Sequence, residues 1–397
     1  MIRISTKTGL CVCILGFFGI FYGGGGADLL AQQVLWSRSD TTYNNFRIPS
    51  LIVTGKGTLL AFAEGREAGD SGDIDILLKR SEDGGHTWSK QLVVWDDGAN
   101  TCGNPCPVVD QSTGRIILLM TWNLGMDNED QIIRKKSKDT RKPYISFSDD
   151  DGLTWSEPED LSSSCKDPDW GWYASGPGVG IQLKSKKYRN RLVIPANHSY
   201  SVKAENEAIR AGYGYGSHVI FSDDGGLSWT LSKTITPGCN ESQVAELSNG
   251  DLMMNMRSYN KKGCRAIARS RDGGASWSDI THDPQLVESV CQASFIEYGT
   301  YQGREVYLFS NPAVAAGRSR MTIKASQDEC LSWSKGRLVH EGPSAYSCLA
   351  ILADGSVGLL YEAGEEDPYE LLLFQSFDAE NIFTQFQNQE LKSKKNQ

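Results

Sequence analysis

One eight-residue pattern, Ser-x-Asp-x-Gly-x-Ser/Thr-Trp, recurs along this chain of 397 residues and constrains its fold more than any other feature. The intact copies begin at Ser81, Ser148, Ser222 and Ser270. A fifth copy, SQDECLSW from Ser326, has Cys330 in the glycine position, so we expect its turn to be distorted or absent. Because one short pattern recurs at irregular spacing, the chain repeats a single supersecondary unit.

The residue types of this pattern are those of a tight turn. An Asp carboxylate accepts backbone N–H bonds within the turn, and Gly permits a positive φ there. The Trp is a large apolar side chain that can pack between neighbouring units. Successive copies begin 67, 74, 48 and 56 residues apart, which suits four-stranded units joined by loops of variable length.

The rest of the chain consists of short β-branched and aromatic runs separated by turn residues, as at 114–122, 250–258 and 355–364. Such runs around Asn/Asp-Gly turns are typical of hairpins. No segment before residue 370 shows a sustained helical period. Five copies and a final strand-rich segment, 345–376, therefore predict an all-β fold, a six-bladed β-propeller in one domain.

The N-terminal residues 1–31 differ from everything that follows. A basic start with Arg3 and Lys7 precedes an apolar run from about Gly9 to Tyr22 and then small residues, as in a secretory signal peptide. The alternative is an uncleaved anchor, but the run is shorter than the roughly 18–20 residues that span a bilayer. We expect export to the periplasm or medium without stable membrane insertion, and cleavage between about positions 27 and 33. The expected propeller domain is 32–390, followed by a disordered charged tail, 391–397.

Charge and cysteine content narrow the function classes. A net charge of −9 argues against a nucleic-acid surface, although a local arginine cluster could still bind an anion. Eight of the ten cysteines lie after the N-terminal run, and an even number in an exported protein permits disulfides of unknown connectivity. No Cys-x-x-Cys pair or histidine cluster predicts a metal site, and no cofactor is implied.

The repeated octapeptides resemble Asp boxes, the turn motif of sialidase β-propellers, which also occurs in propellers that only bind. The segment FRIPS at 46–50 resembles the Phe/Tyr-Arg-Ile-Pro motif that the family carries before its first box. Further segments, 104–110, 176–183, 241–257, 310–326 and 343–362, resemble the family in its order. From about residue 36 to 378, the chain is similar to bacterial-type exo-α-sialidases.

This resemblance implies that three arginines hold the carboxylate of sialic acid. Arginine binds a carboxylate through a bidentate, charge-assisted fork. The three implied residues are Arg47, Arg257 and Arg318. Arg320 competes with Arg318, but the resemblance places the binding arginine at the start of a strand, so we expect Arg320 to lie deeper. Glu362 is expected to support Arg47.

The resemblance also implies a catalytic set of Tyr346, Glu241 and Asp70. A neutral phenol as nucleophile avoids repulsion by the carboxylate of the substrate, but its ordinary pKa near 10 requires a base, Glu241. Asp70 would protonate the leaving oxygen and later activate water, and nearby arginines would favour a more anionic tyrosine oxygen. Alternatively, these residues are structural, and Asp73 or Asp75 rivals Asp70.

The implied function is hydrolysis of terminal α-linked sialic acids from glycoproteins, glycolipids or oligosaccharides, with retention through a tyrosyl-enzyme intermediate. Arg66 and Asn104 would line the pocket near O4 and the N-acetyl group of the sugar. Asn197 and Asn240 match an N-glycosylation pattern that we interpret as accidental. A trans-sialidase and a non-catalytic sialic-acid-binding propeller are the alternatives. We expect a monomer whose partners are sialylated glycans and not nucleic acid.

Overall fold

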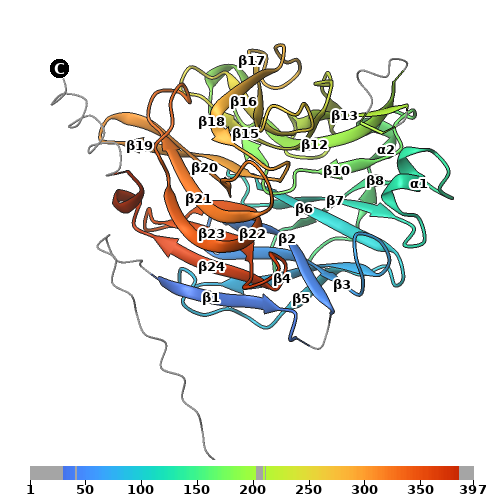
Figure 1. Ribbon diagram of the computed structural model, residues 1–397, viewed down its shortest axis with the longest axis horizontal. Helices are drawn as coiled ribbons and strands as arrows, with labels where there is room; N and C mark the ends of the chain where they lie inside the picture. The colour runs from blue at the N-terminus through green and yellow to red at the C-terminus, as the bar shows by residue number, and fades with distance from the viewer. Residues whose placement is uncertain (1–29, 41–42, 203–208, 211, 384–397) are drawn as a thin grey trace, which may run out of the picture.

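A computed structural model describes residues 30–40, 43–202, 209–210 and 212–383 of the protein. These residues are mostly in β-strands, which form four hydrogen-bonded sheets (Figure 1). The prediction of an all-β fold is therefore confirmed. Short helical segments, too short to leave a periodic signal in the sequence, include α1 (Glu129–Ile133), α2 (Ser162–Cys165) and a 3₁₀ turn (Lys186–Tyr188).

The first sheet contains eight strands. They are β2 (Asn45–Val53), β3 (Leu59–Arg66), β4 (Ile74–Ser81), β5 (Leu92–Trp95), β6 (Thr101–Val109), β7 (Ile116–Asn123), β8 (Lys142–Ser148) and β9 (Glu159–Asp160). Sequence neighbours pair antiparallel within β2–β5 and within β6–β9. The two groups meet through a single parallel pair, Ile74 with Thr101, so the sheet consists of two four-stranded antiparallel units.

Two smaller sheets follow along the chain. One consists of β10 (Tyr173–Ser175), β11 (Ile181–Gln182), β12 (Leu192–Ser201), β13 (Tyr213–Ser222) and β14 (Thr230–Leu231). The other consists of β15 (Cys239–Glu246), β16 (Leu252–Ser258), β17 (Cys264–Ser270) and β18 (Thr281–Val287). All their pairings are antiparallel, as expected for strands joined by short turns.

The fourth sheet joins the two ends of the described chain. Its strands are β19 (Ser294–Tyr301), β20 (Arg304–Pro312), β21 (Ser319–Ser326), β22 (Arg337–Ile351), β23 (Val357–Ala363), β24 (Leu371–Phe377) and β1 (Leu30–Ser37). The first part of β22 pairs with β21 and the second part with β23. In Figure 1, β1 lies beside β24, its antiparallel partner. The core also joins the two ends of the described chain, because Trp36 and Phe62 from its first part and Phe374 from its last strand belong to one buried cluster.

The start of β1 bears on the expected N-terminal boundary. Leu30 lies in the strand although we expected residues 1–31 to be removed, and Gln32 bonds to Tyr361 through its side-chain amide, at 2.5 Å. The signal sequence expected within 1–29 and the charged tail expected at 391–397 lie outside the described residues. In the part of the chain that the structure describes, none of the helices has the length and apolar character needed to cross a bilayer.

Each Asp-box turn is held by the same local hydrogen bonds. In the first box, Gly85 N–H donates to Ser81 Oγ at 2.8 Å, and Thr87 N–H donates to Asp83 at 2.9 Å. Ser81 Oγ also donates to Asp83, at 2.8 Å. The carboxylate thus ties the first half of the box to its second half.

The fifth box forms the same turn despite lacking the glycine. Cys330 N–H donates to Ser326 Oγ at 3.1 Å, and Ser332 N–H donates to Asp328 at 2.9 Å. Glu329 and Cys330 adopt φ values of 60° and 61°, the left-handed region that Gly tolerates best. The prediction of a distorted or absent turn is therefore wrong, because two non-glycine residues accept this conformation.

The described cysteines are not joined in disulfides, which their even number had permitted. All eight cysteines of the described residues are buried and free. They act as small apolar side chains, as buried cysteines commonly do; Cys330, for example, packs in a cluster with Phe295 and Trp333. The same described residues contain no group of three His, Cys, Asp or Glu side chains that could hold a metal ion.

Candidate active site

Eight of the nine predicted site residues line one pocket of about 350 Å³. The strands β2, β6, β15 and β22 contribute Arg47, Asn104, Glu241 and Tyr346, while β16 contributes Arg257. The eight residues are Arg47, Arg66, Asp70, Asn104, Glu241, Arg257, Arg318 and Tyr346. The ninth, Glu362, is fully buried on β23 and ion-paired with Arg47. The fold thus brings together residues that are distant in sequence.

Tyr346, Glu241 and Arg257 form a hydrogen-bonded triangle. The Tyr346 hydroxyl donates to Glu241, and Arg257 Nη1 lies 2.7 Å from Glu241 Oε2 and 3.1 Å from Tyr346 Oη. Burial and the charge of Glu241 raise the pKa of Tyr346 well above its usual value, although the charges of Arg257 and Arg318 lower it. The phenol is therefore neutral at rest. The arginines favour the anionic oxygen, as predicted, but burial and Glu241 outweigh them. The phenol proton already points at a carboxylate that could accept it.

Glu362 fixes two parts of the pocket at once. Its Oε1 accepts hydrogen bonds from Arg47 Nε at 2.7 Å and from Ile48 N–H at 3.0 Å. Its Oε2 accepts from Tyr346 N–H at 2.9 Å. Ile48 has φ 59°, and the β2–β3 register shifts between Arg47 and Ser50, which is how a β-bulge re-aims a side chain. A single buried carboxylate thereby fixes the position of Arg47 relative to the backbone of Tyr346.

Arg318 and Arg320 have different environments. Arg318, just before β21, donates to Tyr369 Oη at 2.6 Å, and its guanidinium carbon lies 5.6 Å from the centre of the Tyr346 ring. Arg320 has a side chain that is 47% exposed and pairs with Glu341. Its φ is 63°, at a register shift of β21. The expectation that Arg320 lies deeper is wrong, because this irregularity breaks the alternation and leaves the side chain at the surface.

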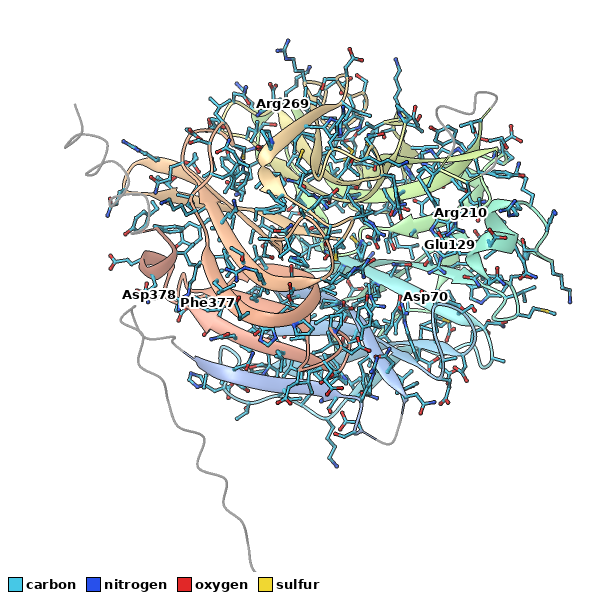
Figure 2. The ribbon with its side chains drawn as sticks, in the orientation of Figure 1. Asp70, Glu129, Arg210, Arg269, Phe377 and Asp378 are labelled. Carbon is cyan, nitrogen blue, oxygen red and sulfur yellow. The ribbon has the colours of Figure 1, made fainter. Side chains whose placement is uncertain are left out.

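Asp70 lies on the loop after β3 and is labelled in Figure 2. Its side chain is 80% exposed, and its Oδ1 lies 2.5 Å from Arg66 Nη1 and 4.0 Å from Arg47 Nη1. Partial burial would raise the pKa of its carboxyl group, but Arg66 foremost and then Arg47 lower it below the usual value. The rivals Asp73 and Asp75 do not line the pocket, and Asp75 accepts a hydrogen bond from Tyr43 at 2.5 Å.

A family model described as a BNR repeat-like domain matches residues 57–359. A sialidase of Bacteroides fragilis is 34% identical over 80% of this chain and 60% of its own length. A sialidase of Micromonospora viridifaciens is 32% identical over 86% of this chain and 53% of its own length. A solved structure, the Hadza microbial sialidase Hz136, has a TM-score of 0.75 at 33% identity and covers 86% of this chain and 67% of that chain.

The chain belongs to the sialidase family. It spans little more than half of the length of the two curated sialidases above. The resemblance inferred from the Asp boxes and the FRIPS segment is thereby confirmed at the level of the family.

The sequence did not predict two buried residues that hold Asn104, namely Glu64 and Arg141. Asn104 has φ 53°, donates its N–H to Glu64 at 2.6 Å and accepts from Arg141 at 2.6 Å. Burial, and secondarily the charge of Arg66, lowers the pKa of Arg141 to about 10. Glu64 also accepts from Arg66 Nε at 2.7 Å. These residues have no sequence motif of their own, so only the fold identifies them.

Other pocket residues were also missed or misjudged in the sequence. Asn197 and Asn240, noted only as glycosylation matches, are buried residues of the pocket wall. Glu129 begins α1 and lies near Arg210 (Figure 2), with 3.9 Å between Glu129 Oε2 and Arg210 Nη2. Further lining residues without a sequence signal include Trp172, Tyr259 and Tyr369.

Proposed function

We propose that this protein is an exo-α-sialidase that hydrolyses terminal α-linked sialic acids from glycoproteins, glycolipids or oligosaccharides. The observation that carries the proposal is the Tyr346–Glu241–Arg257 triangle in a pocket that also contains Arg47 and Arg318. The relatives named as sialidases support the same substrate class.

The three arginines of the pocket suit an anionic sugar. Guanidinium forks bind a carboxylate through charge-assisted hydrogen bonds, and the carboxylate of sialic acid lies on its reacting carbon. Tyr346 in its neutral form approaches that carbon without charge repulsion. Glu241 takes the phenol proton as the tyrosine oxygen forms its bond to the anomeric carbon. The departing glycosidic oxygen receives a proton from Asp70. The Asp70 carboxylate then takes a proton from the water that attacks the anomeric carbon, the bond to Tyr346 breaks, and Glu241 returns the phenol proton, with net retention.

Asp70 needs help from the substrate for this role. Its pKa is lowered chiefly by Arg66, so the protein alone favours the carboxylate over the acid. A bound sugar removes water from the exposed Asp70 side chain, and its carboxylate offsets the arginine charge. Both effects raise the pKa of a carboxyl group. Proton donation by Asp70 is thus linked to substrate binding.

The scaffold that we propose is a six-bladed β-propeller with Asp-box turns. Six antiparallel groups support it. Five have four strands, namely β2–β5, β6–β9, β15–β18, the group from β19 to the first part of β22, and the group led by the second part of β22; the sixth is the five-stranded sheet β10–β14. In this arrangement β1 completes the group of β22, β23 and β24. One domain over 32–390 is part of the proposal, because within the described residues, which end at 383, the four sheets follow one another along the chain.

The test is release of a fluorophore from its α-sialoside, with the products identified by NMR. We expect free sialic acid that first appears as the α-anomer, which reports retention. Transfer to an added sugar acceptor, or an anhydro sugar, would assign a trans-sialidase instead. Tight binding of the product without turnover would leave only the sialic-acid-binding propeller. Tyr346→Phe serves as the inactive control, and a wild-type protein that neither binds nor cleaves would refute the proposal.

Export is part of the same proposal. A periplasmic or secreted sialidase would meet glycans outside the cytoplasm, and the N-terminal sequence pattern supports this location. Cleavage before Leu30 would keep all of β1. N-terminal sequencing of the recovered protein tests the site, and a mature chain that still begins at Met1 and sediments with membranes would contradict export.

A further inference from the structure

A buried ion pair lies outside the pocket but contacts its surroundings. Arg265 on β17 and Glu288, just after β18, have side chains that are 0% and 1% exposed, with Nη1 and Oε2 2.6 Å apart. Neither residue lines the pocket. A fully buried ion pair contributes little net stability compared with well-packed apolar residues, so its value to this protein requires another explanation.

The pair first holds the strand that carries Arg257. Glu288 Oε1 accepts from Ser258 N–H at 2.7 Å, and Ser258 directly follows Arg257 at the end of β16. On the same strand, Arg265 Nε donates to Asn255 Oδ1 at 2.6 Å. Ser258, directly after Arg257, is therefore bound to Glu288, and Asn255, two residues before Arg257, is bound to Arg265.

The pair also holds the segment 288–292, which connects β18 to β19. Arg265 Nη1 donates to Cys291 O at 2.7 Å, beside Val290, whose φ of 58° is unusual for a β-branched residue. Val290 O accepts from Arg318 Nη2 at 3.4 Å, and Cys291 packs in one cluster with Tyr346. The strained turn is thereby fixed where it meets the pocket.

The last residue of the segment extends this contact. Gln292 accepts from Ser347 N–H and donates to Ser347 O, both at 3.0 Å. Ser347 directly follows Tyr346 on β22. The segment 288–292 therefore contacts Arg318 directly and packs against Tyr346, while Glu288 binds the backbone next to Arg257.

We infer that the Arg265–Glu288 pair, through the segment 288–292, is a positioning element that sets Arg257 and Arg318 for the substrate carboxylate. This inference rests on the proposed function. Tyr346 has two further anchors, Glu241 at its hydroxyl and Glu362 at its N–H. Loss of the pair should therefore disturb the two arginines more than the nucleophile, so KM should rise more than kcat falls.

The test is Glu288→Gln, which leaves the buried guanidinium without its counter-charge. We expect kcat/KM to fall about 10- to 100-fold, because small misplacements of binding groups are amplified in catalysis, and most of the loss should appear in KM. The dissociation constant of the unsaturated analogue of sialic acid, measured by calorimetry, should rise by a similar factor. Arg265→Lys keeps the charge but loses the guanidinium fork, so it should give a smaller rise and covers the case that Glu288→Gln does not fold.

A matched control separates positioning from general stability. Asp151→Asn removes the charge from another ion pair, Arg80–Asp151 at 3.3 Å, whose side chains are each 9% exposed and do not line the pocket. It should lower the melting temperature while changing KM less than about twofold. If Glu288→Gln and Arg265→Lys likewise change only the melting temperature, the pair is structural and the inference is wrong.

The wild-type protein distinguishes this inference from the proposed function. If it binds the analogue but releases no sialic acid, hydrolysis is refuted, and weaker analogue binding by the two variants would still support positioning. If it hydrolyses the sialoside and the variants keep the wild-type KM, positioning alone is refuted. A wild-type protein without binding or turnover would refute both.

Discussion

The Asp-box turns and the pocket both rely on hydrogen-bonded carboxylates, but these carboxylates bind partners at very different distances along the chain. In the first box, Asp83 bonds to Ser81 and Thr87, two and four positions away in sequence. In the pocket, Tyr346 bonds to Glu241 across 105 positions, and Arg47 bonds to Glu362 across 315. These box contacts are local and repeated, whereas these two pocket contacts are long-range and occur once. The turns stabilise the scaffold locally, and the pocket depends on strands that are distant in sequence.

The carboxylates of the two regions also differ in their surroundings. Asp150 of the second box is held by the hydroxyl and N–H of Thr154, at 2.6 and 2.8 Å, on an exposed turn. Glu362 in the pocket region is fully buried against a guanidinium. Changes in the boxes should therefore act on folding stability alone, while changes in the pocket should act on catalysis.

The largest expected effect is that of Tyr346→Phe. The change removes only the oxygen that Glu241 and Arg257 contact, so we expect an unchanged melting temperature and a loss of about 10²- to 10³-fold in kcat/KM. A fluorinated sialosyl donor should label the wild-type protein at Tyr346, as peptide mapping by mass spectrometry can show. A label on Glu241 or Asp70 would reassign the nucleophile.

Arg318→Ala should have the next largest effect. Loss of a charge-assisted contact to the substrate carboxylate costs on the order of 2–4 kcal/mol in kcat/KM, mainly through KM. Arg320→Ala is the matched control, because Arg320 is exposed and pairs only with the surface residue Glu341 among its salt-bridge partners in the described residues. Steady-state kinetics of both variants decides the matter, and the reverse ranking would move the third arginine of the site to Arg320.

Local sequence patterns predicted the local structure and part of the site. The octapeptides identified the turns, and FRIPS identified Arg47, because both are contiguous in the chain. Glu64, Arg141 and Arg265 act only through contacts made by the fold, so no short pattern could reveal them. The two errors, at Cys330 and Arg320, both involve a non-glycine residue with positive φ, a conformation that residue type alone does not predict.

Gly85 and Cys330 occupy equivalent positions, and their contrast tests why one box tolerates a side chain. A Cβ on Gly85 would overlap the Phe374 ring, so Gly85→Ala should destabilise the protein by about 1–3 kcal/mol. Cys330 already carries a Cβ at φ 61°, so Cys330→Ala should cost about 1 kcal/mol, from lost packing of the thiol. Denaturant unfolding measures both. Equal losses would show that neighbouring packing does not decide the glycine requirement.

The smallest expected effect is the pH dependence of Asp150→Asn. Hydrogen bonds, first from the Thr154 hydroxyl and then from its N–H, lower the pKa of Asp150 to about 2, below the roughly 3.9 of an unfolded chain. The unfolded state therefore takes up the proton first as the pH falls. The stabilisation by this carboxylate is complete above about pH 4 and is lost as the pH approaches 2.

At pH 7 we therefore expect Asp150→Asn to lower the free energy of unfolding by about 0.5–1 kcal/mol, with kcat and KM unchanged. Urea titrations at pH 7, 4 and 3 should show the difference from wild type shrinking as the pH falls. A difference that stays constant with pH would mean that the turn uses the shape of the side chain and not its charge. A changed KM would contradict the separate roles of turns and pocket, because no residue of this exposed turn lines the pocket.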